Sequence, residues 1–275
     1  MRFGLKVNPG TWQEAAQWAR IAEEAGFDGL WTGDNLRNSR DAATPVHDGP
    51  TIITAWAAIT TRIRVGLLIA NMAYRRPTVL VKQAVSIDHV SAGRFELGIG
   101  SGLWPADHAM AGVPFWDPRE RAERLREFVG VVDRLLSGDT GDQAGPHYPH
   151  AGAALSPAPV QPRIPLIVAA NGPKGLAVVA DHADAWVTFT GAAAEDDFYQ
   201  ASVERGRTLD ALCGERGRQV RRILLAYGSI TPWASVDDFA RMVERYEAIG
   251  FDEIVCYAPK PEERAVFDKV VSRFA

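Results

Sequence analysis

The chain has 275 residues, of which 47% are hydrophobic and 23% are charged, and these proportions are ordinary for a globular protein with a large core. Its formal net charge of −4 argues against a nucleic-acid partner or an anionic membrane surface. The two cysteines lie far apart, and no apolar run approaches ~20 residues, so we expect a cytoplasmic protein with no disulfide framework, cysteine metal site or membrane span.

Segments with strand and helix patterns alternate along the chain. The first strand is predicted at residues 3–7, and Thr11 and Gly26 mark the start and end of a helix over residues 12–25. The later strands are predicted at residues 27–32, 63–70, 94–100, 164–169, 185–189, 220–227 and 251–257. The helices that follow them are predicted at residues 51–61, 77–90, 118–136, 173–182, 195–213, 235–248 and 261–274.

Strict strand–helix alternation indicates a parallel sheet, because parallel strands need crossover connections. Eight such pairs favour a single (β/α)8 TIM barrel over residues 1–275. The alternative is a doubly wound open sheet, which would usually carry a G-x-G-x-x-G motif after its first strand, and the chain has none there. Residues 137–163 break the alternation and are predicted to form an excursion over one barrel mouth.

Chemistry in such a barrel lies at the carboxyl ends of the strands. Asp34 and Asn35 end the second strand and can face the mouth, although Asp34 can instead close a turn. Gly100, Ser101 and Gly102 end the fourth strand. The missing side chains there would let a flat ligand approach the backbone, and a tight turn is the alternative.

The fifth strand leads into a loop and helix that suit a phosphate. Pro173 stands where the helix would begin, and the backbone N–H groups before and after it would point out at the positive end of the helix dipole. Lys174 adds a positive charge, and an ordinary strand–helix turn is the alternative. The candidate residues of this loop are Ala170, Asn171, Gly172, Pro173, Lys174 and Gly175.

Other chemistries find no support in the sequence. The 6 histidines show no metal-ligand spacing, and there is no G-x-S-x-G motif of a hydrolase. His182 stands at the end of a predicted helix, where we expect it to cap carbonyl groups.

Four stretches of the sequence together resemble the luciferase-like monooxygenase superfamily. They are residues 3–5 with 25–28, residues 76–95 (RP, KQ, ID and SAGRF), residues 97–102 (LGIGSG) with 111–115, and residues 172–174 (GPK) with 183–185. Members of this superfamily use either FMN or the deazaflavin F420, and the GPK loop looks more like the F420-using branch. The resemblance implies that this loop holds the cofactor phosphate, whereas barrels in general bind phosphates after strands 7 and 8.

The resemblance also implies a flavin-supporting bulge at the end of the third strand. The matching residues are Leu68, Ile69, Ala70 and Asn71, where a non-proline cis peptide is expected behind the ring. Relatives that oxidise alcohols or sugars resemble this chain at Asp34 but have a histidine next. Here the next residue is Asn35, which cannot exchange a proton near neutral pH, so alcohol or sugar-phosphate oxidation is not expected.

Three functions follow from this reading. The first is an F420H2-dependent reductase that transfers hydride to a small organic substrate. The second is an FMN-dependent monooxygenase that uses reduced flavin and O2 and is supplied by a separate reductase. The third is a barrel that binds flavin without turnover. The resemblance implies a homodimer.

Further candidates of the site complete this reading. Asp34, Asp107 and His108 are possible proton donors. An apolar substrate wall, with core packing as the alternative for each residue, has the candidates Trp31, Trp104, Phe115 and Trp116.

Overall fold

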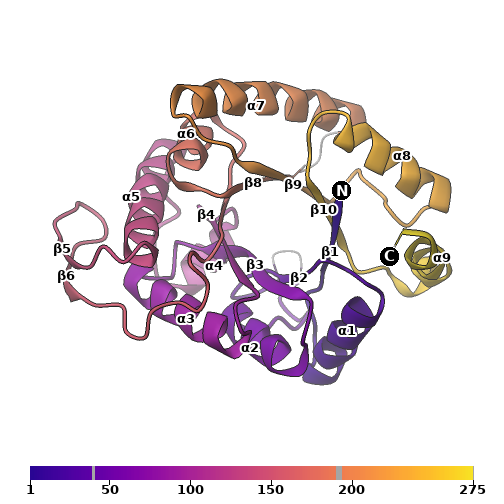
Figure 1. Cartoon of the computed structure of the whole chain (residues 1–275), viewed down its shortest axis with the longest axis horizontal. Coiled ribbons are helices and arrows are strands. Elements are labelled where there is room, and N and C mark those ends of the chain that lie inside the picture. The colour runs from indigo at the N-terminus through magenta and orange to yellow at the C-terminus, as the bar shows by residue number, and fades with distance from the viewer. Residues whose placement is uncertain (39–40, 190–193, 275) are drawn as a thin grey trace.

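Parallel strands close into a barrel in the order β1-β10-β9-β8-β7-β4-β3-β2 (Figure 1), which confirms the predicted TIM-barrel fold. The computed structural model describes residues 1–38, 41–189 and 194–274. The barrel strands are β1 (Arg2–Lys6), β2 (Gly29–Thr32), β3 (Arg64–Asn71), β4 (Phe95–Gly100), β7 (Leu166–Ala169), β8 (Ala185–Phe189), β9 (Arg221–Ala226) and β10 (Glu253–Tyr257). Each lies within about two residues of its prediction.

Helices surround the barrel (Figure 1). At the first of them, the Thr11 side chain accepts a hydrogen bond from the Glu14 N–H at 3.2 Å, so the predicted cap is present. None of the described helices is both long and apolar enough to cross a membrane. The helices are α1 (Trp12–Glu24), α2 (Gly49–Ile59), α3 (Pro77–Val90), α4 (Pro105–Met110), α5 (Pro118–Leu136), α6 (Pro173–His182), α7 (Glu195–Glu215), α8 (Val236–Glu247) and α9 (Arg264–Phe274), the last preceded by a 3-10 turn, η1 (Pro261–Glu263).

The excursion after α5 lies against the outer helices α3 and α5, and none of its described residues lines the cavity at the carboxyl ends of the strands. The predicted position over a barrel mouth is therefore wrong, and the excursion contains a hairpin that the sequence did not indicate. Strands β5 (Gly141–Gln143) and β6 (His150–Ala153) pair antiparallel and stand out beyond α3 and α5 (Figure 1). Tyr148 anchors the hairpin: its ring is buried and packs edge-on against Phe128 of α5, with the ring centroids 5.2 Å apart. The excursion therefore attaches to the main core and has no core of its own.

A tryptophan is the largest side chain in the hydrophobic cluster inside the barrel. Trp31 of β2 is fully buried there with Leu68, Ile167 and Val255. Glycines on the neighbouring strands make room for it, because a Cβ atom at Gly66 would lie 2.3 Å from the indole. Trp31 is thus part of the packed barrel interior, and the expectation that it walls a substrate site is wrong.

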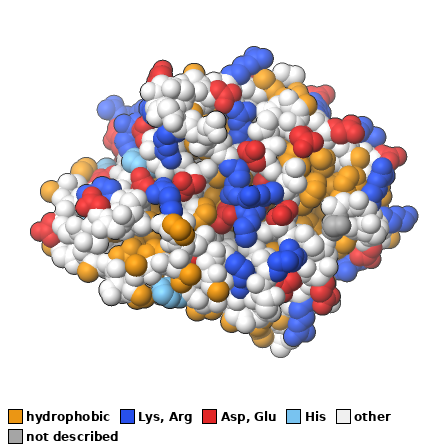
Figure 2. Space-filling view, in the orientation of Figure 1, with side chains coloured by type: hydrophobic (Ala, Val, Ile, Leu, Met, Phe, Trp, Pro, Cys, Tyr) orange, Lys and Arg blue, Asp and Glu red, His pale blue; other side chains and the backbone are white. Residues whose placement is uncertain are grey.

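Charged side chains close the amino-terminal end of the barrel. Glu96 and Glu253 are almost completely buried and pair with Arg64 and Arg221, which begin β3 and β9. In the view of Figure 2, basic and acidic side chains gather near the middle of the visible face. Buried carboxylates need such partners to offset the loss of hydration.

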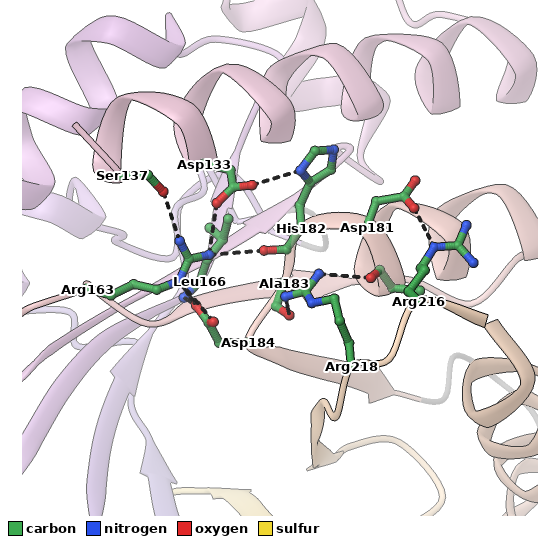
Figure 3. A network of polar contacts seen from close by, with 11 residues as sticks. Asp133, Ser137, Arg163, Leu166, Asp181, His182, Ala183, Asp184, Arg216 and Arg218 are labelled. Atoms are coloured by element: carbon green, nitrogen blue, oxygen red, sulfur yellow. Dashed lines mark hydrogen bonds and ion pairs between the residues drawn. The ribbon is translucent and has the colours of Figure 1, made fainter. Parts of the chain in front are cut away.

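A second polar network joins α5 to the end of α6 (Figure 3). His182 does not cap carbonyls as expected, since its Nδ1 lies 2.9 Å from the Asp133 carboxylate. Arginines bind the carbonyls instead: Arg163 donates to His182 O at 3.2 Å, and Arg218 donates to Ala183 O at 2.8 Å. Arginine has more donors and a longer reach than histidine, which explains the exchange of roles.

Candidate functional site

A cavity of about 870 Å³ opens at the carboxyl ends of the strands. Residues from every barrel strand or the loop that follows it contribute to its lining, and its volume is in the range of small-molecule and cofactor sites. Most sequence-predicted site residues meet here: Asp34, Asn35, Leu68, Ile69, Asn71, Gly100, Ser101, Gly102 and Ala170 to Gly175 all line the cavity, whereas Ala70, Asp107 and His108 do not.

The end of β3 forms a ledge on the cavity wall. The peptide between Leu68 and Ile69 is cis, and the pairing of β3 with β4 shifts register between Leu67 and Ala70, which confirms the expected bulge. Ile69 projects toward β4, because a Cβ atom at Gly100 would lie 1.9 Å from its Cδ1. The glycines of β4 thus make room for the ledge itself, a role that the sequence reading did not include.

Outside the bulge, the strand alternation decides which residues reach the cavity. Ala70 is fully buried and packs in the core between strands and helices, so its predicted place at the cofactor is not supported. Asn71 lines the cavity, and its Oδ1 accepts a hydrogen bond from the Ala73 N–H at 2.9 Å.

The loop between β7 and α6 presents free backbone donors to the cavity. Gly172 is the N-cap residue of α6, no side chain caps this helix, and Pro173 opens it. Within the described part of the chain, the N–H groups of Gly172, Lys174 and Gly175 donate no hydrogen bond. A Cβ atom at Gly172 would meet nothing within 4 Å, so this side of the loop is open. The geometry has the properties of an anion site.

Asp34 is a buried carboxylate with both oxygens engaged. Arg75 donates to its two oxygens at 2.7 and 2.6 Å, and the Asn71 N–H donates at 3.2 Å. Arg75 also binds Asp48 at 2.6 Å. Burial opposes the charge of Arg75, but the two carboxylates outweigh it and raise the pKa of the guanidinium. Both oxygens of Asp34 are therefore engaged by Arg75 within the protein and are not left free for a cavity ligand.

Asp107 and His108 lie behind the cavity wall. Asp107 accepts hydrogen bonds from Asn35 Nδ2 at 3.0 Å and from the Leu36 N–H at 3.1 Å, so it holds the loop after β2. His108 is fully buried, and its Nδ1 lies 2.8 Å from Pro114 O. The short helix α4, which the sequence reading missed, turns both side chains into the protein. Neither is placed to donate a proton to a cavity ligand.

The expected aromatic wall is reduced to one residue. Trp104 lines the cavity and is 41% exposed. Phe115 and Trp116 instead pack edge-on against His108, with ring centroids 5.0 and 5.2 Å away. Core packing, the alternative reading, holds for Trp116, which is partly buried against the core, whereas Phe115 is 44% exposed; neither residue lines the cavity.

Lys6 is a site residue that the sequence reading missed. It ends β1, is only 6% exposed and lines the cavity. Its Nζ donates to Leu68 O, the carbonyl of the ledge, and lies 5.4 Å from the centroid of the Tyr257 ring. Burial lowers the pKa of Lys6 to about 8. The available signal was a lysine in the strand position after the buried Leu5, on the face that points into the barrel.

The described residues that line the cavity give it a positive balance. Asp34 is the acidic member of this lining, and its charge is matched by Arg75. The basic residues of the lining are Lys6, Arg37, Arg119, Arg121 and Lys174.

Residues 2–232 match the family model described as luciferase-like monooxygenase. A protein of Mycobacterium tuberculosis that carries the provisional name of coenzyme F420-dependent oxidoreductase is 30% identical over 204 residues. That alignment covers 68% of this chain and 55% of the relative, so the chain spans little more than half of that relative's length.

Two solved structures are similar in fold. An F420-dependent secondary alcohol dehydrogenase bound to an F420-acetone adduct has a TM-score of 0.83 and 16% identity, covering 98% of this chain and 97% of its own. The oxygenating constituent of 3,6-diketocamphane monooxygenase from Pseudomonas putida, in complex with FMN, has a TM-score of 0.76 and 13% identity, with 98% and 96% covered. At these identities the similarity shows the fold alone.

Proposed function

Because this chain belongs to the luciferase-like monooxygenase family, we propose that it is an oxidoreductase that binds coenzyme F420 in the cavity at the barrel mouth. The observation that carries the proposal is the open, uncapped amino terminus of α6 on the cavity wall. Unpaired N–H donors and the helix dipole together favour a phosphate group at this position.

The other residues of the cavity fit the same cofactor. The ledge at Leu68 and Ile69 offers an apolar support on which a flat ring can rest. The N–H groups of Gly172, Lys174 and Gly175 would hold the phosphate, with the ammonium group of Lys174 beside them. The excess of basic residues in the lining lowers the cost of placing an anionic ligand there.

We further propose that the chemistry is reduction of a small organic substrate. F420H2 supplies a hydride from C5 when bound, and the protein orients the reactants and excludes water. Asn35 stands on the wall where a proton-accepting histidine would be needed for alcohol oxidation. An amide has no proton to exchange near neutral pH, and Asp34 is engaged by Arg75, so a reductive direction suits this site better.

The second candidate is an FMN-dependent monooxygenase. An FMN-bound monooxygenase component shares the fold, and the α6 terminus would suit the FMN phosphate equally well. In that case a separate reductase supplies the reduced flavin. Binding of a flavin without turnover is the third candidate.

A homodimer is also proposed, and light scattering would measure the mass of the protein in solution.

A binding titration with F420 and with FMN tests the proposal. The α6 terminus suits either phosphate, so the preference between the two cofactors rests on the relative that is named for F420, and we expect F420 to bind at least about tenfold more tightly than FMN. Tighter binding of FMN, together with O2 consumption in the presence of reduced FMN, would support the monooxygenase. Failure of both cofactors to bind would refute the proposed site. Oxidation of bound F420H2 by an added acceptor would exclude binding without turnover.

A further inference from the structure

In the part of the chain that the structure describes, Lys6 has no counter-charge, unlike the buried carboxylates of Asp34 and Glu253. Asp34 has Arg75, and Glu253 has Arg64 and Arg221. Among the described residues, Lys6 forms no ion pair, and its Nζ makes one hydrogen bond, to Leu68 O. Burial is the sole influence on its lowered pKa. A desolvated cation is normally paired, so the protein leaves this charge to be matched by whatever occupies the cavity.

The barrel topology places Lys6 opposite the candidate phosphate site. In the closed order of strands, β1 and β7 are four steps apart in either direction. Lys6 ends β1, and the loop with Gly172 follows β7. A ligand whose phosphate binds at α6 and whose body crosses the mouth therefore brings its far end toward Lys6. Since Lys6 binds the carbonyl of Leu68, its ammonium group also lies beside the ledge.

We propose that Lys6 provides the positive charge that pairs with the negative charge on the ring system of the reduced cofactor, so that the site binds the reduced form more tightly than the oxidised form. This inference rests on the proposed function. Reduced flavins and deazaflavins carry a negative charge on the pyrimidine part of the ring near neutral pH, and a nearby cation stabilises that state. The interaction is strong because the ammonium group is shielded from water.

The test compares dissociation constants of the oxidised and reduced cofactor, measured without O2, in the wild-type protein and in variants. Lys6→Met removes the charge and keeps an unbranched side chain. Lys6→Gln also removes the charge but keeps a donor for Leu68 O. We expect both variants to lower the preference for the reduced form by about tenfold, which corresponds to a midpoint potential of the bound two-electron couple about 30 mV more negative. Lys260→Met, an exposed lysine of the loop after β10, is the matched control and should change neither constant.

Several outcomes would overturn the inference. It is wrong if Lys6→Met weakens both redox forms equally or leaves both unchanged. It is also wrong if Lys6→Gln keeps the wild-type preference, because the hydrogen bond to Leu68 would then matter and the charge would not. A thermal melt of each variant shows that it is folded, and the glutamine variant keeps the test decisive if the methionine variant is not. A wild-type protein that binds neither F420 nor FMN would instead refute the proposed function.

Discussion

Replacing Gly172 by valine tests the proposed phosphate site with little disturbance of the fold. A Cβ atom at this position would meet nothing within 4 Å, and the residue has φ −104°, which any L-residue adopts. We expect its side chain to obstruct the close approach that the free N–H groups of the α6 terminus need in order to bind an anion. Valine is a poorer N-cap residue than glycine, so we expect a loss of stability of no more than about 1 kcal/mol.

The expected loss of cofactor affinity is much larger than this loss of stability. A hydrogen bond to a charged group contributes roughly 1.5–3 kcal/mol, and the valine side chain would displace the phosphate from at least two donors. A loss of ~3 kcal/mol corresponds to a dissociation constant more than about 100-fold higher. The lost hydrogen bonds involve the ligand alone, so the folded state without cofactor should keep its structure.

Fluorescence titration with F420, alongside a thermal melt, measures both quantities. Gly214→Val is a matched control, because this exposed glycine of α7 also has nothing within 4 Å of its Cβ position and does not line the cavity. The control should bind F420 like the wild type. A folded Gly172→Val protein with unchanged affinity would refute the reasoning and move the phosphate to another loop of the barrel mouth.

Three other changes have defined outcomes. Lys174→Ala should raise the F420 dissociation constant by less than about tenfold, because an exposed ammonium group is hydrated and screened. A loss of affinity that disappears in high salt would support this reasoning, and a loss of affinity that does not depend on salt would contradict it. Asn35→His should leave F420 affinity within about threefold and introduce slow F420-dependent oxidation of a secondary alcohol; efficient oxidation by the wild type would contradict this. Burial alone would raise the pKa of Asp133, but hydrogen bonds from His182 and Arg163 outweigh it and hold that pKa below its usual value. The network therefore contributes stability above about pH 4 that is lost as the pH falls through the lowered pKa, so urea unfolding of wild type and Asp133→Asn should converge in acid.

Local patterns were sufficient for most of the fold and for the start of helix α6. Helix α6 begins at Pro173 as predicted, because proline at the first helical position is a local preference. The bulge at Leu68 and Ile69 was expected only from a resemblance to a known family, because neither the spacing of apolar residues nor the hydropathy of the strand indicates it. The helix α4 was missed because its six residues are too few to show a helical period.

The directions of individual side chains at the mouth depended on tertiary structure. Asp107 and His108 were candidates by residue type, but the orientation of α4 turns them away from the cavity. Trp31 fits inside the barrel because glycines on two other strands, Gly4 of β1 and Gly66 of β3, leave space for its ring, and no local pattern can relate either glycine to it.

The sequence by itself determined the alternation of strands and helices, the parallel barrel and the helix start that offers backbone donors, because each depends on neighbouring residues and on the period of apolar positions. Only the tertiary structure decided that Lys6 is a buried cation at the cavity. Its surroundings come from Leu68 and Tyr257, which are brought together by the pairing of β1 with β10 and by the closure of the barrel through β2 and β3. The ammonium group of Lys6 becomes buried only when the barrel closes, because its desolvation requires atoms from strands that are far apart in the chain to surround it.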